Sequence, residues 1–230
     1  MTLGARRSAA PGLRRPHAAR TGHRGWHSRG YLPHFDAGGV FQFVTYRLGD
    51  SLPASVVARL DDALADLPED ERALQRRIRI DDHLDQGRGC CCLRQPECAQ
   101  VVCDAWQHFA GARYDLCAWV VMPNHVHVLI RAYEGYPLPE VVRSWKHFTA
   151  MRINRLRGSH GHFWQNDHWD RFIRDEAHFA RTVAYIHENP VKAGLVATTE
   201  AWRWSSAGFS GGVASHEARC EAPRSGALPE

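Results

Sequence analysis

The stretch VVMPNHVHVLI, residues 120–130, places two histidines one residue apart within an apolar run. Side chains two apart in a β-strand point to the same face, so His125 and His127 project together, away from Val126 and Val128. Two neutral imidazoles that lie close together can share a divalent cation. The pair alone leaves two readings open, a metal site or a chance pairing in a chain with 15 histidines.

A metal-dependent reaction also needs a third ligand and a nucleophile, and YIHENP, residues 185–190, offers a candidate for each. Tyr185 and Asn189 are four residues apart, so a helix would place them on one face. A phenol with its ordinary pKa of about 10 is a poor nucleophile, but it can attack a phosphodiester whose oxygens a metal polarises. The alternatives are a packing role for Tyr185 and a helix-capping role for Asn189.

The elements that must position these residues follow from the periodicity of the chain. Alternating β-branched and aromatic residues predict strands at 40–48, 113–122 and 125–132, with a turn at 123–124 and a partly extended segment at 162–175. Helical spacing predicts helices at 53–67, 69–84, 96–111, 138–158 and 176–189, the last ended by Pro190. Because the turn at 123–124 is too short for a parallel crossover, we expect an α+β fold, an antiparallel sheet with helices on one face.

Length and composition favour a single domain with extensions. The chain has 230 residues and a formal net charge of +4, which permits a polyanionic partner without requiring one. Residues 1–30 contain no acidic residue and predict a disordered basic arm, residues 31–208 the folded body, and residues 209–230 a disordered tail. No apolar stretch reaches the length of a membrane span and no signal-peptide core follows the basic start, so we expect no membrane partner.

The seven cysteines do not resemble a secreted disulfide framework, because their number is odd and three of them are consecutive at 90–92. This usage predicts a reducing cytoplasm. A structural zinc site at Cys92, Cys98 and Cys103 is disfavoured, because these spacings match no common ligand pattern and the chain has no CxxC pair.

Taken in order, MPNHVHVLI, WDRFIRD and YIHENPVKAGLV resemble the tyrosine transposases of the insertion-sequence-200 type. More closely, they resemble the REP-associated tyrosine transposases, which belong to the HUH (histidine, hydrophobic, histidine) endonuclease superfamily. The resemblance extends from about Gly30 to Trp204 and includes the terminal WRWSSAG. The HUH motif alone is moderately specific, and the tyrosine motif behind it makes the match strong.

The resemblance implies a ferredoxin-like α+β sandwich with the HUH strand central in the sheet and the tyrosine helix beside it. It implies that His125, His127 and Asn189 bind a divalent metal, Mg or Mn, and that Tyr185 is the nucleophile. The expected activity is cleavage and rejoining of single-stranded DNA near palindromic hairpins through a covalent 5′-phosphotyrosine. Mg prefers oxygen ligands and imidazole suits softer ions, so the choice of ion depends on the resemblance alone.

Basic residues near these motifs are candidates for DNA contacts, with a solvated helix surface as the alternative. In relatives, the region corresponding to 138–158 and the basic N-terminus hold an imperfect palindromic hairpin. Trp164 and Trp169 are candidates for base stacking, although large aromatics more often pack in the core. The predicted DNA-binding residues are Arg143, Lys146, Arg152, Arg155, Arg171, Arg174 and Lys192.

The main alternative function is a catalytically decayed protein of the same fold that binds hairpin DNA. A metal hydrolase of the amidohydrolase class is disfavoured, because such enzymes need a larger barrel and further ligands. We expect a monomer, with a dimer as the alternative, in the bacterial cytoplasm at the nucleoid. The segment at 72–97 makes the chain longer than compact relatives, and the sequence assigns it no role.

Overall fold

The computed structural model describes residues 25–28, 33–208 and Cys220. Its centre is an antiparallel sheet with the strand order β4-β5-β3-β6. The strands are β3 (Phe41–Arg47), β4 (Tyr114–Val121), β5 (His125–Ala132) and β6 (Trp169–Phe172). With helices between β3 and β4 and between β5 and β6, this is the β-α-β-β-α-β order of a ferredoxin-like fold. The predicted α+β class, antiparallel sheet and central HUH strand are confirmed.

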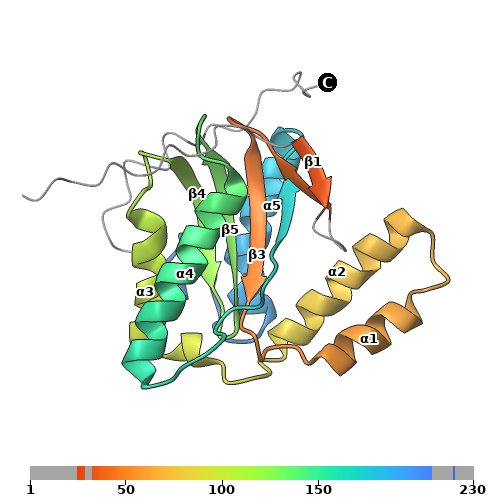
Figure 1. The fold of residues 1–230 in the computed structure, drawn as a ribbon, viewed down its shortest axis with the longest axis horizontal. Helices are drawn as coiled ribbons and strands as arrows, with labels where there is room; N and C mark the ends of the chain where they lie inside the picture. The colour runs from red at the N-terminus through yellow and green to blue at the C-terminus, as the bar shows by residue number, and fades with distance from the viewer. Residues whose placement is uncertain (1–24, 29–32, 209–219, 221–230) are drawn as a thin grey trace, which may run out of the picture.

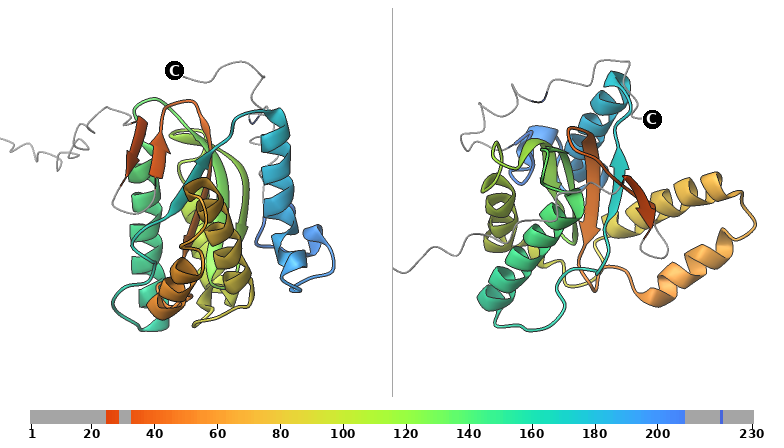
Figure 2. Two further views of the ribbon diagram at one scale, coloured as in Figure 1. Left: turned by 90° about the vertical axis from the view of Figure 1, so that its right-hand side faces the viewer. Right: turned by 45° about the horizontal axis from the view of Figure 1, so that its top comes forward.

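Helices cover both faces of the sheet (Figure 2). On one face lie α3 (Pro96–Gln107) and α4 (Leu138–Arg157), which pack against each other. On the other lies α5 (Glu176–Lys192), which contacts β4 and β5. The prediction that helices cover one face only was wrong. The physical reason lies in β5, whose residues of both orientations are buried and so need cover on both sides.

Each face of the sheet has its own core. On the α3/α4 face, three tryptophans pack with Val126 and Val128. The Trp106 indole donates to the Tyr46 hydroxyl over 3.0 Å, and the Trp145 indole to the Tyr114 hydroxyl over 2.9 Å, which satisfies these buried polar atoms. The α5 face holds a smaller cluster of Phe41, Phe43, Ala118, Val120, Met122, Leu129, Ile173 and Ile186. None of the described helices combines the length and apolar character that a bilayer crossing requires.

A helical hairpin projects from the lower edge of this sandwich (Figure 1). It consists of α1 (Ala54–Ala63) and α2 (Glu69–Asp85), which pack through a small apolar cluster around Leu52, Val56 and Leu60. The C-terminal end of α2 is fixed to the sheet by the buried Asn124, whose amide donates to the carbonyls of Leu84 and Arg88 over 3.1 and 2.9 Å. This hairpin lies within the segment between the first sheet strand and the HUH strand.

The ends of the described chain differ from the prediction in two places. Residues 25–28 were expected to belong to a disordered arm, but they form β1 (Gly25–Ser28), which pairs with β2 (Pro33–Asp36) in a separate sheet. Cys220, in the predicted disordered tail, forms a disulfide with Cys117 of β4, a pairing that the sequence did not suggest. The rest of the predicted arm and tail, residues 1–24, 29–30, 209–219 and 221–230, lies outside the described residues.

The tyrosine helix α5 begins and ends for identifiable reasons. The Asp175 carboxylate accepts from the backbone N–H of His178 over 2.7 Å, an N-cap of the usual kind. The prediction that Pro190 ends the helix was wrong, since α5 continues to Lys192. Proline lacks the N–H that would bond one turn back, but the Asn189 and Pro190 carbonyls still accept from Ala193 and Leu195 over 3.0 and 2.9 Å. Asn189 is therefore held inside regular helix, buried against the sheet.

Candidate nuclease site

The two HUH histidines lie together on the α5 face of β5. Both side chains are buried, and their Nε2 atoms are 3.1 Å apart. Two nitrogen ligands at right angles on one ion, each about 2.1 Å from it, would also lie about 3 Å apart. The spacing of the pair is therefore that of two neighbouring ligands of a metal.

Hydrogen bonds to the outer ring nitrogens orient both imidazoles. Asn124 uses its Nδ2 to donate to α2, so its Oδ1 accepts from His125 Nδ1 over 2.8 Å. His125 Nδ1 therefore carries the proton, and its Nε2 presents a lone pair towards His127. The Thr45 hydroxyl lies 2.8 Å from His127 Nδ1 and can accept from it in the same way. Such partners are the usual supports of metal-bound histidines.

The site keeps these histidines uncharged at neutral pH. Burial lowers the pKa of His125 to about 3. Burial, together with the neighbouring His125 and the positive charge of Arg77, lowers the pKa of His127 well below its ordinary value. A neutral imidazole has the free lone pair that a metal ligand needs.

The tyrosine helix brings its two predicted residues to the same place. The rings of Tyr185 and His127 have centroids 5.3 Å apart in an edge arrangement, and Tyr185 also packs edge-on against Phe43. The Asn189 amide nitrogen lies 3.5 Å from His127 Nε2, while its Oδ1 is buried and makes no hydrogen bond. A flip of this amide would turn an oxygen donor towards the histidine pair. The structure thus brings Tyr185, Asn189, His125 and His127 together.

Three residues of α2, which sequence reasoning missed, complete this site. The Tyr185 hydroxyl donates to Asp81 Oδ2 over 3.0 Å. The guanidinium of Arg77 lies 3.6 Å from the same carboxylate and 5.8 Å from the centroid of the Tyr185 ring. Asp85 Oδ1 lies 3.9 Å from His125 Nε2 and has no hydrogen-bond partner. Arg77, Asp81 and Asp85 are spaced i, i+4 and i+8, so a predicted helix places them on one face. This spacing was the available signal, but the sequence does not show which element packs against that face.

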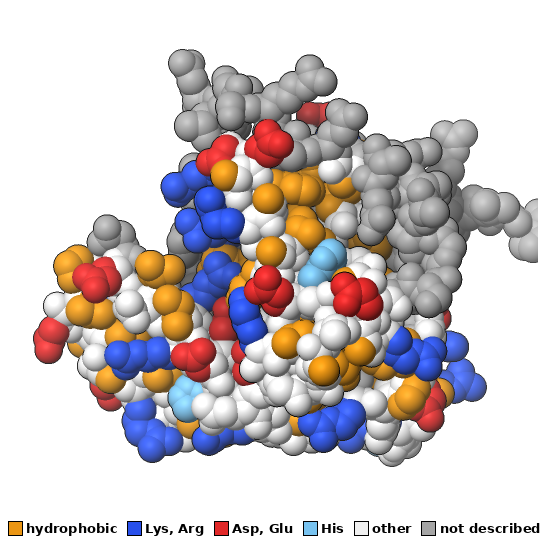
Figure 3. Space-filling view, turned by 180° about the vertical axis from the view of Figure 1, so that it is seen from behind, with side chains coloured by type: hydrophobic (Ala, Val, Ile, Leu, Met, Phe, Trp, Pro, Cys, Tyr) orange, Lys and Arg blue, Asp and Glu red, His pale blue; other side chains and the backbone are white. Residues whose placement is uncertain are grey.

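Positive charge gathers beside the tyrosine. Arg171 of β6 is half-buried, and burial together with the charges of Arg77 and Arg174 lowers its pKa. The Arg77 guanidinium stacks 3.7 Å from the ring centroid of Trp169, which is also half-buried. Lys192 lies 5.5 Å from the ring centroid of Tyr185 and pairs with Glu188 at 3.1 Å. Seen from behind, Lys and Arg side chains line the boundary between the helical hairpin and the rest of the domain (Figure 3).

The remaining predicted DNA-binding residues lie on the other side of the sheet, on α4. Arg143, Arg152 and Arg155 are exposed there. Arg143 and Lys146 line a groove of about 660 Å³ between α4 and the segment 161–168. The Lys146 ammonium donates to the carbonyls of residues 165, 166 and 167 over 2.6, 2.8 and 3.3 Å, so it fixes this segment. Trp164, a candidate for base stacking, is buried and donates to Thr149 over 2.8 Å.

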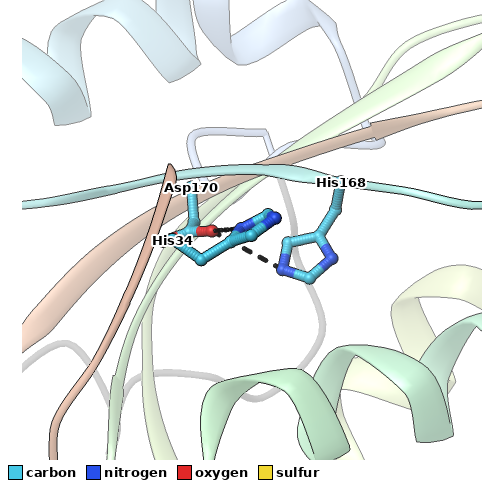
Figure 4. A group of neighbouring side chains, drawn as sticks. All are labelled: His34, His168 and Asp170. Atoms are coloured by element: carbon cyan, nitrogen blue, oxygen red, sulfur yellow. Dashed lines mark hydrogen bonds and ion pairs between the residues drawn. The ribbon is translucent and has the colours of Figure 1, made fainter. Parts of the chain in front are cut away.

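A second group of potential ligands, which the sequence reasoning missed, lies on the α3/α4 face. His34 of β2 and His168 and Asp170 at β6 are buried, and their ligand atoms lie within 4.8 Å of one another (Figure 4). His34 Nδ1 hydrogen-bonds to Asp170, His34 Nε2 lies 3.5 Å from Asp167, and His168 Nε2 lies 3.7 Å from Asp170. This group could hold a metal ion. His34 is far in sequence from His168 and Asp170, which are two residues apart, and no motif links the three.

The electrostatics of this second group are dominated by its carboxylates. Burial would lower the pKa of His34, but hydrogen bonds and the negative charges of Asp167 and Asp170 raise it to about 9. Burial would likewise raise the pKa of Asp167, and its bonds to His34 and to the His168 backbone lower it instead. In the absence of a cation, His34 is therefore a protonated imidazolium at neutral pH.

The central HUH strand faces the tyrosine helix, as the resemblance noted from the sequence implied. In the comparison with known proteins, residues 96–189 match the family described as "Transposase IS200 like". Over this segment, which is less than half of the chain, the protein is similar to the IS200-like Y1 transposases. The matched segment begins at α3 and ends at Asn189, so it contains the histidine pair and Tyr185, whereas α2 lies before it.

The curated relatives are distant in sequence. A REP-associated tyrosine transposase of Escherichia coli K12 is 28% identical over 98 residues, 40% of this chain and 54% of that protein. A Haemophilus influenzae protein assigned to the same group is 28% identical over 103 residues, 40% of this chain and 58% of that protein. The match therefore spans little more than half the length of these relatives. A solved REP-associated tyrosine transposase bound to a REP hairpin has a TM-score of 0.47 and 19% identity, covering 78% of this chain and 81% of that one.

Proposed function

We propose that this protein is a metal-dependent endonuclease and strand transferase for single-stranded DNA. It cleaves and rejoins DNA near palindromic hairpins through a covalent 5′-phosphotyrosine formed by Tyr185. The observation that carries the proposal is the meeting of Tyr185 with the His125 and His127 pair, from elements far apart in the chain. Neither residue group alone distinguishes a nuclease from ordinary packing, and their juxtaposition favours the nuclease.

The donor set around the histidine pair fits a divalent cation. His125 Nε2 presents a lone pair, and Asn189 Oδ1 and Asp85 Oδ1 are buried oxygens that have no hydrogen-bond partner among the described residues. Two imidazole nitrogens with two such oxygens suit Mn, and the oxygen donors also suit Mg. When bound, such an ion would withdraw charge from the oxygens of a scissile phosphate.

The chain's own residues supply attack and charge neutralisation. Tyr185 Oη attacks phosphorus and displaces the 3′ oxygen, so the bond energy is retained in the phosphotyrosine for later rejoining. Arg77 and Arg171 lie beside the tyrosine and offer guanidinium groups to the phosphate. Phe43 packs edge-on against the Tyr185 ring and is itself packed edge-on against Trp169.

The proposed substrate is hairpin DNA of the REP type, because both sequence relatives carry that association in their names. Arg174 and Lys192 border the tyrosine site, and Arg143, Arg152 and Arg155 offer a second basic surface on α4. All four site residues meet within one chain, which supports action as a monomer. The proposed setting is the bacterial cytoplasm at the nucleoid.

The decisive experiment incubates the purified chain with Mn or Mg and a labelled pool of single-stranded hairpins. The single-stranded segment 5′ to each hairpin is randomised, so that no single target sequence is assumed. We expect a DNA–protein adduct that survives denaturant, carried by Tyr185. Tyr185→Phe should abolish it, because the phenyl ring packs in the same place but has no nucleophilic oxygen.

Tyr136→Phe is the matched control, since Tyr136 is exposed in the loop before α4. It should form the adduct at the wild-type level. An adduct that persists in Tyr185→Phe would refute Tyr185 as the nucleophile. A wild-type chain that binds the hairpins but yields no adduct with any member of the pool would identify a DNA-binding protein that does not cleave.

A further inference from the structure

We propose that Asp81 is the proton acceptor for Tyr185, an inference that rests on the proposed function. A phenol attacks phosphorus far better as its proton leaves, so a tyrosine nuclease gains from a base within hydrogen-bonding reach. Asp81 Oδ2 accepts the Tyr185 hydroxyl proton over 3.0 Å, which is the distance required. None of the other hydrogen bonds of the described residues involves the Tyr185 hydroxyl, while the histidines point their Nε2 atoms at each other.

The surroundings of Asp81 suit a base of moderate strength. Burial raises the pKa of its carboxyl group, the charge of Arg77 and the Tyr185 hydrogen bond lower it, and the net pKa lies above the ordinary value. The charged neighbours on its own helix are Arg77, Asp82 and Asp85, and from α5 the facing group is Tyr185 itself. Burial and the charge of Asp81 raise the pKa of the Tyr185 phenol as well, so the raised carboxyl pKa of Asp81 offsets part of the difference between the two groups.

The position of Asp81 is fixed by more than the helix alone. Arg77, one turn earlier, holds the carboxylate at 3.6 Å while stacking on Trp169. The end of α2 is fastened by the two hydrogen bonds of Asn124, the residue that also orients His125. The helical hairpin, to which the sequence assigned no role, is in this way coupled to both halves of the site.

The chemical step needs no reactant besides the DNA and water. The Tyr185 Oη–H bond breaks and the proton passes to Asp81 Oδ2, while the Oη–P bond forms and the bond from phosphorus to the 3′ oxygen breaks. The departing 3′ oxygen takes a proton from solvent water. In the rejoining step, the 3′ hydroxyl of the DNA returns its proton to solvent as its oxygen attacks phosphorus, the bond from phosphorus to Tyr185 Oη breaks, and the proton on Asp81 passes to the Tyr185 oxygen.

Asp81→Asn tests this role, because the amide oxygen still accepts the tyrosine hydrogen bond but cannot take the proton. The full-length chain is assayed for the rate of adduct formation with the hairpin pool and Mn across a pH series. We expect the rate to fall about 100-fold or more. We also expect loss of the rise in rate with pH that deprotonation of Asp81 gives the wild type. Glu71→Gln, at an exposed position near the start of the same helix, is the control and should retain both rate and pH profile.

The outcomes separate this inference from the proposed function. No adduct from the wild type would defeat the proposed function itself. A wild-type adduct with an unchanged or faster Asp81→Asn rate would overturn the inference alone, as would a slower rate that keeps the wild-type pH profile. If Asp81→Asn lowers the thermal midpoint more than Glu71→Gln does, Asp81→Glu is the deciding variant, because its carboxylate must restore the rise in rate with pH.

Discussion

Two buried histidine clusters lie on opposite faces of one sheet, and their electrostatics are opposite. His125 and His127 lie on the α5 face, bonded at their outer nitrogens to an amide and a hydroxyl, and burial keeps them neutral. His34 lies on the α3/α4 face between two carboxylates, and its pKa rises to about 9. Histidine is therefore neutral, with a nitrogen able to bind a metal, in the His125–His127 pair, and protonated at His34.

The difference teaches that the hydrogen-bond partner, more than burial, decides what a buried histidine can do. A neutral partner that accepts from Nδ1 leaves the other nitrogen free as a ligand. A carboxylate at each nitrogen favours the doubly protonated ring. A metal at the second cluster would have to displace the proton of His34, so proton and metal are competing occupants there.

The largest expected effect follows from removing one partner of the second cluster. His34→Ala would leave the buried Asp170 and the partly buried Asp167 without the His34 cation, and breaking a buried pair in this way costs about 3–5 kcal/mol. His125→Ala removes only an uncharged ring and should cost about 1–2 kcal/mol. Urea unfolding of the two variants at neutral pH measures both free energies. An equal loss of unfolding free energy in the two variants would contradict the proposed electrostatic difference between the two clusters.

The sequence predicted one half of this contrast and not the other. Strand alternation placed His125 and His127 together, and helical spacing did the same for Tyr185 and Asn189, because each pair is local. Their meeting was expected only through the resemblance to a known family.

The second cluster could not be predicted in the same way, since it joins β2 to residues around β6 across the fold. Asp81 and Arg77 were not predicted as site residues for a related reason. The periodicity of a polar helix shows which residues share a face, but not which element packs against that face. The course of α5 past Pro190 and the Cys117–Cys220 bridge depend likewise on tertiary contacts.

The next effect is a dependence of stability on pH. The folded pKa of His34, about 9, lies above its ordinary value of 6.5, so its contribution is complete below pH 6.5 and is lost as pH rises towards 9. The loss should be on the order of 3 kcal/mol, measured by urea unfolding from pH 6 to pH 9.5. His34→Gln should remove this slope. A wild-type stability that is flat over this range and falls on adding a chelator would instead mark a metal in the second cluster.

The smallest of the three effects concerns the support of the first cluster. Asn124→Ala removes the acceptor that keeps the proton on His125 Nδ1, and it also frees the end of α2. Loss of such a supporting bond should weaken Mn binding about 10–100-fold, measured by calorimetry on the chain without DNA. Asn166→Ala, an exposed asparagine in the loop before β6, is the control and should bind Mn as the wild type does. Asn124 is not proposed to contact the substrate, so its effect on Mn binding reports on the support of His125. If Asn124→Ala kept full Mn affinity, burial alone, and not the hydrogen bond at Nδ1, would make His125 a metal ligand.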